Sequence, residues 1–401
     1  MHKRAPSIPF FCVAIGIAIA LSGCGVKARK AGGYMDTPEA HYKQGMKYWM
    51  AEKCDKAQEE FNLAKSLDKK YAPAFAGLAL TTAKKAQQAA DKKSESQGFS
   101  EALKLADQAQ NLGDKIPDGY IAKALVLTMM HEGKDPPEKW LGQVEKQYAI
   151  ALKKDPANAA VYYYRGGCYK KAFAFAKAAA DFKMVLELKK DFTAEADEQW
   201  ALIQKIERAA PGTEVGKRIA LVDKISRADI AALFVSELGI DKLADKRRKL
   251  PENTGFQAPE DPRTMQVDTL KSMEAMTDID SHWAKNFILD IVERNIRGLE
   301  PYPDHTFKPD ELINRGEYAL MVEDILMLIL GDETLATKNI GAAASRFPDV
   351  NLSYPAYNAI CNAVDKGVMD AELNGTFGPE KSVSGPDALL VIRKIKELNK
   401  L

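Results

Sequence analysis

The sequence predicts an all-α fold, built from a repeated helical hairpin and followed by a smaller helical module. In the first half of the chain, small and aromatic residues recur at helical spacing in a unit of about 34 residues. After residue 212 the period changes, and helical patterns resume beyond a polar, proline-rich stretch. The composition agrees, because 46% hydrophobic and 28% charged residues are typical of a folded chain. The formal net charge of +1 gives no reason to expect nucleic acid as a partner.

Residues 1–23 are predicted to be an export signal, because a basic start precedes an apolar run that is too short to be a transmembrane helix. The tetrapeptide that ends in Cys24 resembles the lipobox of bacterial lipoproteins. That resemblance implies cleavage before Cys24, acylation of its thiol and new amino group, and a lipidated tether over 24–37. Because Gly25 follows where an inner-membrane lipoprotein would have Asp, the resemblance favours the outer membrane of a two-membrane bacterium. Ordinary secretion with a free Cys24 is the alternative.

The first repeat spans residues 38–71 and predicts two antiparallel helices. Its small residues would let the helices approach closely, while its aromatic side chains fill the space beside them. These positions are Gly45, Tyr48, Ala57, Phe61 and Ala64. They resemble the pattern of the tetratricopeptide repeat, which implies a curved solenoid with a concave face that binds a protein partner. The sequence does not identify that partner.

Further copies extend this array over 38–212. The second copy is interrupted by the polar stretch 92–97, which we expect to be a lengthened turn, and the third also has a stretched turn. The fourth copy is regular, and a capping helix is predicted over 194–208. Pro211 and Gly212 would end that helix.

The second half begins with 213–240 and an insertion or linker over 241–276. An amphipathic helix is then predicted after Asp278, capped by Asp280 or Ser281, and another runs from about residue 313 to 329. A start element with His282-Trp283, a middle element with Tyr302-Pro303-Asp304 and an end element with Asn314-Arg315-Gly316 follow one another in order. On these motifs residues 277–335 resemble one S-layer homology repeat, whose motif arginine is Arg315. A second copy over 336–401 lacks the motif arginine, and 213–240 resembles the end of a third copy. The resemblance therefore implies a module of about three repeats.

In that family, three repeats form a pseudo-threefold prism whose grooves bind cell-wall polysaccharide, often with an acidic ketal that pairs with an arginine. The resemblance assigns polysaccharide binding to Arg315 and Arg227, supported by Trp283, Asn314 and Glu317. A guanidinium suits a carboxylate, and an aromatic ring suits the apolar face of a sugar. Alternatively, each arginine pairs with Glu317 or Asp229 to hold the fold together, and Trp283 fills the core.

No catalytic motif is present, and the five histidines never fall at metal-ligand spacing, so we expect no enzyme, metal or cofactor. The preferred prediction is a cell-envelope tether, in which lipid at Cys24 holds the membrane, the C-terminal module holds a cell-wall or surface glycan, and the repeats bind a protein. The alternative is a scaffold or assembly factor for a pilus, secretion or polysaccharide-export machine, with the C-terminal module as a protein-docking domain.

Overall fold

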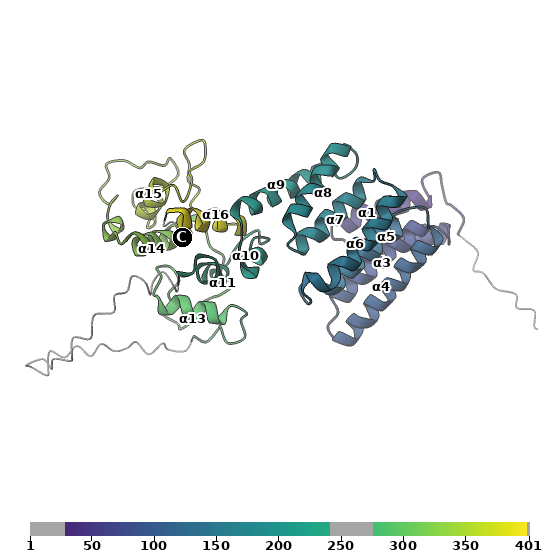
Figure 1. Cartoon of the computed structure of the whole chain (residues 1–401), viewed down its shortest axis with the longest axis horizontal. Helices are drawn as coiled ribbons and strands as arrows, with labels where there is room; N and C mark the ends of the chain where they lie inside the picture. The colour runs from purple at the N-terminus through teal and green to yellow at the C-terminus, as the bar shows by residue number, and fades with distance from the viewer. Residues whose placement is uncertain (1–28, 241–275, 399–401) are drawn as a thin grey trace, which may run out of the picture. The chain divides into compact units, whose positions relative to one another are not determined.

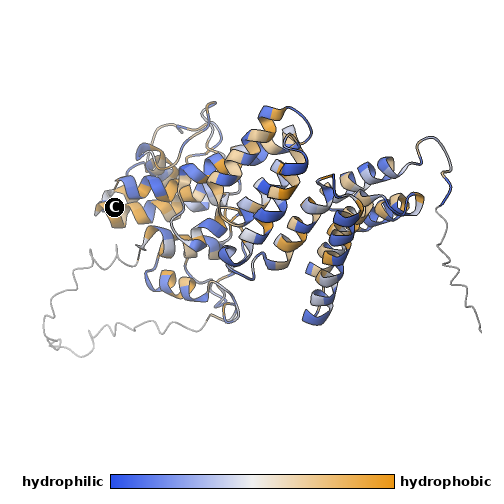
Figure 2. Cartoon of the chain, turned by 45° about the vertical axis from the view of Figure 1, so that its right-hand side comes forward, coloured by the Kyte–Doolittle hydropathy of each residue, from blue (hydrophilic) through white to orange (hydrophobic). Residues whose placement is uncertain are grey.

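The computed structural model describes residues 29–240 and 276–398 (Figure 1). Its regular elements there are all helical, which confirms the predicted class. The chain divides into two compact units: one runs to His131 and takes in Ala149–Lys154, and the other holds Glu132–Tyr148 and everything from Asp155 onward. Figure 2 shows that helices of both units carry apolar and polar residues side by side, as expected where one face is buried.

Several predicted features lie outside the described residues: the export signal, Cys24, and nearly all of the linker over 241–276. Within the described ranges, no helix combines the length and the apolar character needed to cross a bilayer.

The first unit is a set of paired helices. Helix α1 packs against α2, α3 against α4, and α5 against both α3 and α4, which is the predicted hairpin order. The helices are α1 (Pro38–Met50), α2 (Cys54–Leu67), α3 (Ala72–Gln87), α4 (Lys92–Leu112) and α5 (Asp118–His131).

A buried aromatic ring explains the pattern of small residues in this unit. Phe61 is fully buried, and a Cβ atom added to Gly45 or Gly77 would lie 2.5 Å from its ring. Both positions must therefore lack a side chain for the helices to close around Phe61. The same arrangement returns further along the chain, where a Cβ on Gly166 would lie 2.9 Å from the ring of Phe182.

The prediction of a turn over 92–97 was wrong, because this stretch forms the start of α4. The Asp91 carboxylate accepts hydrogen bonds from the backbone N–H groups of Lys93 and Ser94, at 3.0 and 2.9 Å, and so begins the helix. The polar side chains there are largely exposed on the first turns of a long helix. The polar composition of 92–97 correctly indicated an exposed segment, but the N-cap at Asp91 makes that segment helical rather than a turn.

In the second unit helices also pack in sequence, α7 on α8 and α8 on α9. Helix α9 coincides with the predicted capping helix. The loop 132–136 before α6 is longer than the loop 172–174 between α7 and α8, as predicted for the third copy. These helices are α7 (Ala159–Lys171), α8 (Phe175–Leu188) and α9 (Thr193–Ala209), and α6 (Pro137–Lys154) has residues in both units.

The C-terminal module has a cyclic arrangement. Helix α11 packs on α13, α14 packs on α15, and α16 packs on α10, so each end helix covers the front helix of the next repeat. The elements are α10 (Glu214–Ile219), α11 (Arg227–Leu233), the π-helix η1 (Phe234–Leu238), α13 (Lys285–Glu293), α14 (Arg315–Leu330), the 3-10 helix η3 (Glu333–Ala336), α15 (Tyr357–Asp365) and α16 (Gly385–Leu398).

A ring of backbone hydrogen bonds closes this arrangement. Ile225 N–H donates to Val383 O at 2.9 Å, Ile313 N–H to Ile225 O at 3.1 Å, and Val383 N–H to Ile313 O at 3.3 Å. Each residue donates to one member of the trio and accepts from the other, so the three are related by a pseudo-threefold axis. The predicted module of about three repeats is thus confirmed.

The predicted cap of the helix after Asp278 was wrong. Helix α13 begins at Lys285, and its N-cap residue, Ala284, has no capping side chain. The Asp280 carboxylate instead pairs with Lys285 Nζ at 2.8 Å. A turn over 282–284 separates Asp280 and Ser281 from the helix, which the apolar periodicity alone did not reveal.

Candidate functional site

The two motif arginines occupy equivalent places, each two residues after a member of the backbone ring. Arg227 is only 7% exposed. Its Nε donates to Phe307 O at 2.9 Å, Nη1 to Gly298 O at 2.7 Å and Nη2 to Glu300 O at 2.9 Å. The guanidinium carbon also lies 4.9 Å from the centre of the Tyr302 ring. This arginine therefore holds the loop of the next repeat through its backbone.

Arg315 makes the same kind of contact one repeat later. Its Nε donates to Phe377 O at 3.1 Å and its Nη2 to Asp370 O at 2.9 Å. The guanidinium carbon lies 4.6 Å from the Phe377 ring centre. Arg315 is half-buried, with two such bonds where Arg227 has three.

The loops that contain Phe307 and Phe377, which the two arginines contact, are each also held by a carboxylate. Asp278 accepts from the N–H groups of Phe307 and Lys308, at 2.9 and 2.7 Å. Asp349 accepts from those of Phe377 and Gly378, at 2.9 and 2.6 Å. Desolvation alone would raise the pKa of Asp349, but these two bonds favour its charged form and hold the pKa below the usual value.

The third equivalent position is closed. Gly385 stands where the other repeats have arginine, and a Cβ there would lie 1.8 Å from Ile219 O and 2.7 Å from the Ile219 carbonyl carbon. Its N–H donates to Val222 O at 2.8 Å. The chain after α10 thus fills the place of a groove, which explains the absence of the motif arginine.

A cleft of about 290 Å³ lies beside Arg227. Tyr302 lines it, half-buried, and its hydroxyl donates to Glu311 Oε2 at 2.6 Å. Lys308 Nζ lies 4.1 Å from the centre of the Tyr302 ring. The full lining comprises Arg227, Gly298, Glu300, Pro301, Tyr302, Pro303, Glu311, Leu312, Ile313, Glu317, Leu320 and Met321.

The charges of this cleft do not match an anionic ligand. Three of the lining side chains, Glu300, Glu311 and Glu317, are carboxylates, and the Arg227 guanidinium already donates to three carbonyl groups. Carboxylates accept hydrogen bonds from hydroxyl groups, and an aromatic ring covers the apolar face of a sugar. The lining is therefore better suited to an uncharged sugar than to an acidic one.

The position beside Arg315 lacks these features. Tyr302 and Glu372 are equivalent, because the backbone N–H of each donates at 2.8 Å to the backbone carbonyl oxygen of the threonine four residues later. Where the first loop pairs Tyr302 with Glu311, the second pairs Glu372 with Lys381 in a close ion pair. An aromatic platform is therefore present beside Arg227 and replaced by a charged pair beside Arg315.

Asn314 and Glu317 form a capping box at the start of α14. Glu317 N–H donates to Asn314 Oδ1, and Asn314 N–H donates to a Glu317 carboxylate oxygen, both at 2.9 Å. Ser226 and Asp229 do the same for α11. The alternative in which Glu317 or Asp229 pairs with an arginine is therefore wrong.

Trp283 is 51% exposed and stacks edge-on against Phe287, with ring centres 6.3 Å apart. It is thus not a core filler, and it is absent from the lining of the Arg227 cleft. Tyr302 is not among the predicted site residues, although Tyr302-Pro303-Asp304 is a motif of the repeat. Across the described residues, no three His, Cys, Asp or Glu side chains converge as a metal site would require.

Comparison with known proteins agrees with the C-terminal geometry. The S-layer homology domain model matches residues 275–319 and 346–388. Two proteins of Acetivibrio thermocellus are similar to 43% and 44% of this chain: Cell surface glycoprotein 1, with 26% identity, and the Cellulosome-anchoring protein, with 27% identity. The chain spans only 6% and 32% of the length of these relatives.

Among solved structures, a thermophilic TPR protein from Thermus thermophilus covers 42% of this chain and 81% of its own, with 16% identity and a TM-score of 0.34. The assignment of the array therefore rests on the helix pairing described above. The C-terminal half of the chain, by contrast, carries S-layer homology repeats, which associate it with the cell envelope.

Proposed function

We propose that this protein is a non-catalytic tether of the cell envelope. Lipid at Cys24 holds it to a membrane, which is the outer membrane in a two-membrane bacterium. The C-terminal module binds a cell-wall or surface polysaccharide, and the helical array binds a protein partner. The S-layer homology match and the names of the two relatives, which refer to the cell surface and to anchoring, support this role.

The observation that carries the glycan-binding part is the cleft beside Arg227. Of the three equivalent positions marked by Arg227, Arg315 and Gly385, it is the one that has the Tyr302 ring beside a cavity, since the ring equivalent to Tyr302 is missing beside Arg315 and Gly385 closes the third position. In this proposal, Tyr302 stacks on a sugar ring, and Glu311 and Glu317 accept hydrogen bonds from its hydroxyls. Arg227 positions the loop that presents Tyr302, and Trp283 does not contact the ligand.

Sedimentation of the full chain with purified cell-wall sacculi tests this part. Tyr302→Ala removes the platform and should weaken binding about five- to tenfold, which corresponds to about 1 to 1.4 kcal/mol for one aromatic contact. Glu372→Ala changes the equivalent residue of the next repeat and is the matched control, which should bind as the unchanged protein does.

Equal binding by the Tyr302→Ala and unchanged proteins would remove the cleft from the proposal. If the unchanged protein does not bind sacculi or extracted surface polysaccharide at all, the alternative is favoured, in which the module docks a protein of an envelope machine. Cross-linking of the full chain in intact cells would then identify that protein, and the same experiment tests the proposed partner of the helical array.

The lipid anchor has its own test. Mass analysis of the exported protein should show a chain that begins at Cys24 and carries acyl groups such as palmitate. Cys24→Ala should release the protein from the membrane fraction. A mature protein without acyl groups would contradict the anchor and leave glycan binding untouched.

A further inference from the structure

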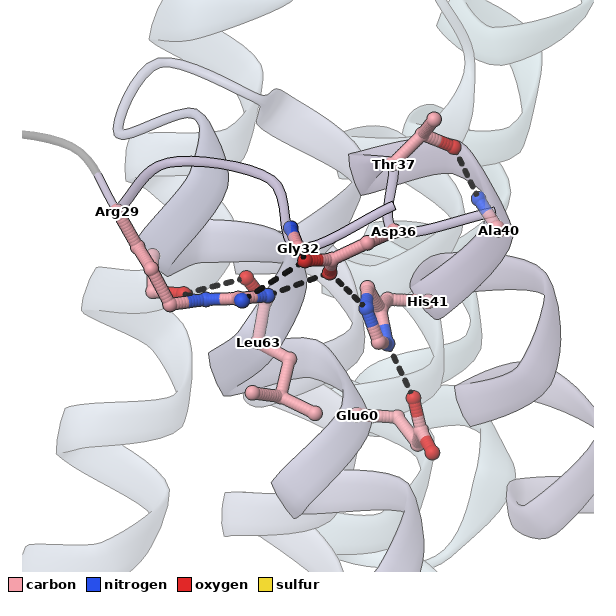
Figure 3. A network of polar contacts seen from close by, with 9 residues as sticks. Arg29, Gly32, Asp36, Thr37, Ala40, His41, Glu60 and Leu63 are labelled. Carbon is pink, nitrogen blue, oxygen red and sulfur yellow. Dashed lines mark hydrogen bonds and ion pairs between the residues drawn. The ribbon is translucent and has the colours of Figure 1, made fainter. Parts of the chain in front are cut away.

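The segment before α1 is folded into a clasp, which we define as residues 29–36 (Figure 3). The guanidinium of Arg29 meets the Asp36 carboxylate through two bonds, Nη1 to Oδ2 at 2.8 Å and Nη2 to Oδ1 at 2.5 Å. Gly32 N–H donates to the same carboxylate at 2.5 Å. The two ends of the clasp are therefore joined.

The clasp is also fixed to the first helical hairpin. His41, in α1, contacts Asp36 Oδ1 through Nε2 at 2.9 Å and Glu60 Oε2, in α2, through Nδ1 at 2.6 Å (Figure 3). The backbone N–H of Arg29 donates to Ser66 O at 2.8 Å, near the end of α2. Both ends of the segment are thus tied to the helices, so its turn is held in one place.

The turn holds two adjacent apolar side chains in water. Tyr34 is 95% exposed and Met35 is 75% exposed. A single exposed apolar residue needs no explanation, but these two are neighbours on a turn whose ends are both fixed to the helices. Lys30, on the same segment, is also exposed.

We propose that the tip of the clasp, Tyr34 and Met35, inserts into the headgroup layer of the membrane that holds Cys24. This inference rests on the proposed acylation of Cys24. Arg29 is the fifth residue after Cys24, so a fully extended chain places it at most about 17 Å from the anchor. Because Asp36 returns the chain to Arg29, the tip stays within reach of the same surface.

The chemistry of the tip suits this occupant. A tyrosine has an apolar ring and a polar hydroxyl, which is why aromatic residues gather at membrane interfaces. Met35 adds flexible apolar surface, and Lys30 is attracted to anionic headgroups. A second contact beside the acyl chains would hold the first helical hairpin at a defined distance from the bilayer.

Fluorescence quenching in vesicles tests the proposal. The full chain, with acylation of Cys24 verified by mass, is reconstituted into phosphatidylethanolamine and phosphatidylglycerol vesicles that contain brominated lipids. Tyr34→Trp places a reporter at the tip. Met50→Trp places a matched reporter on another exposed apolar position, at the opposite end of α1 and about 18 Å along the helix axis. The unchanged protein gives the background of its four tryptophans.

We expect the added emission of the Tyr34→Trp protein to shift to the blue and to be quenched by bromine, while that of the Met50→Trp protein is not. An acylated Tyr34→Trp protein whose added emission is neither shifted nor quenched would overturn the membrane contact, and would leave the lipid anchor standing. Absence of acyl groups on Cys24 is a different result, because it removes the anchor on which the inference rests.

Discussion

Replacing Gly385 with alanine should destabilise the C-terminal module, although it adds only one methyl group. The new Cβ would lie 1.8 Å from Ile219 O and 2.7 Å from the attached carbonyl carbon. Both are backbone atoms, so no side chain can rotate away. The start of α16 must then separate from the end of α10.

The expected loss in the free energy of unfolding follows from this contact. Forcing a methyl group into a closed contact costs about 1 to 3 kcal/mol. Separation also weakens the hydrogen bond from Gly385 N–H to Val222 O, which contributes about 1 kcal/mol. The lower entropy of an unfolded chain with alanine offsets about 0.4 to 1 kcal/mol. The net loss is about 1 to 3.5 kcal/mol, equivalent to a fall of about 2 to 14 °C in Tm for a domain of this size.

Urea and thermal unfolding of the full chain, followed by circular dichroism, would measure this loss, and hydrogen exchange would locate it in α10 and α16. Gly167→Ala is the matched control, because a Cβ on Gly167, in α7, meets no atom within 4 Å. It should stabilise the protein by about 0.5 to 1 kcal/mol. If Gly385→Ala unfolds at the same urea concentration as the unchanged protein, the explanation for the missing arginine is wrong.

Three further predictions concern other contacts. Phe61→Ala should lower the stability of the first unit by about 3 to 5 kcal/mol, measured by thermal unfolding, because Phe61 is fully buried. The hydrogen bonds that lower the pKa of Asp349 should stabilise the module fully above pH 3.8, the usual pKa of the group, and this stabilisation should be lost as the pH falls through the lowered pKa. Asp349→Asn should remove this contribution to the acid dependence when the free energy of unfolding is measured over a series of pH values. Burial lowers the pKa of His41, but its bonds to Glu60 and Asp36 outweigh burial and raise it above 6.5, so the contribution of His41 should be complete below pH 6.5 and lost as the pH rises through the raised pKa. Lower protection factors for the amides of residues 29–36 above that pKa, after correction for the intrinsic rise of exchange with pH, would support this sign, and unchanged protection factors would refute it.

The helical fold was predictable because packing repeats at fixed spacing. Gly45 and Phe61 form one contact whose two members both appear in the sequence pattern. Capping was less predictable, since Asp91, Asp280 and Ser281 are all suitable cap residues and geometry selected only the first. A short polar side chain indicates a local hydrogen bond, but its neighbours in space decide which group it binds.

The site was predictable only in part. The sequence identified Arg227 and Arg315 as equivalent, but their hydrogen bonds go to backbone carbonyl groups, which no side-chain pattern records. The role of Tyr302 depends on the cleft that surrounds it. Gly385 was recognised as a departure from the motif, while its cause, the backbone at Ile219, lies far away in the sequence.

The backbone ring of Ile225, Ile313 and Val383 has a consequence for biogenesis. Its first and last members are separated by the linker and a whole repeat, so the ring cannot close until nearly all of the polypeptide has been synthesised. Closing so long a loop costs little additional entropy but slows folding. The face of α10 that α16 covers must therefore stay uncovered until the C-terminal repeat arrives, and a chain cut short before Val383 should become a substrate for proteases.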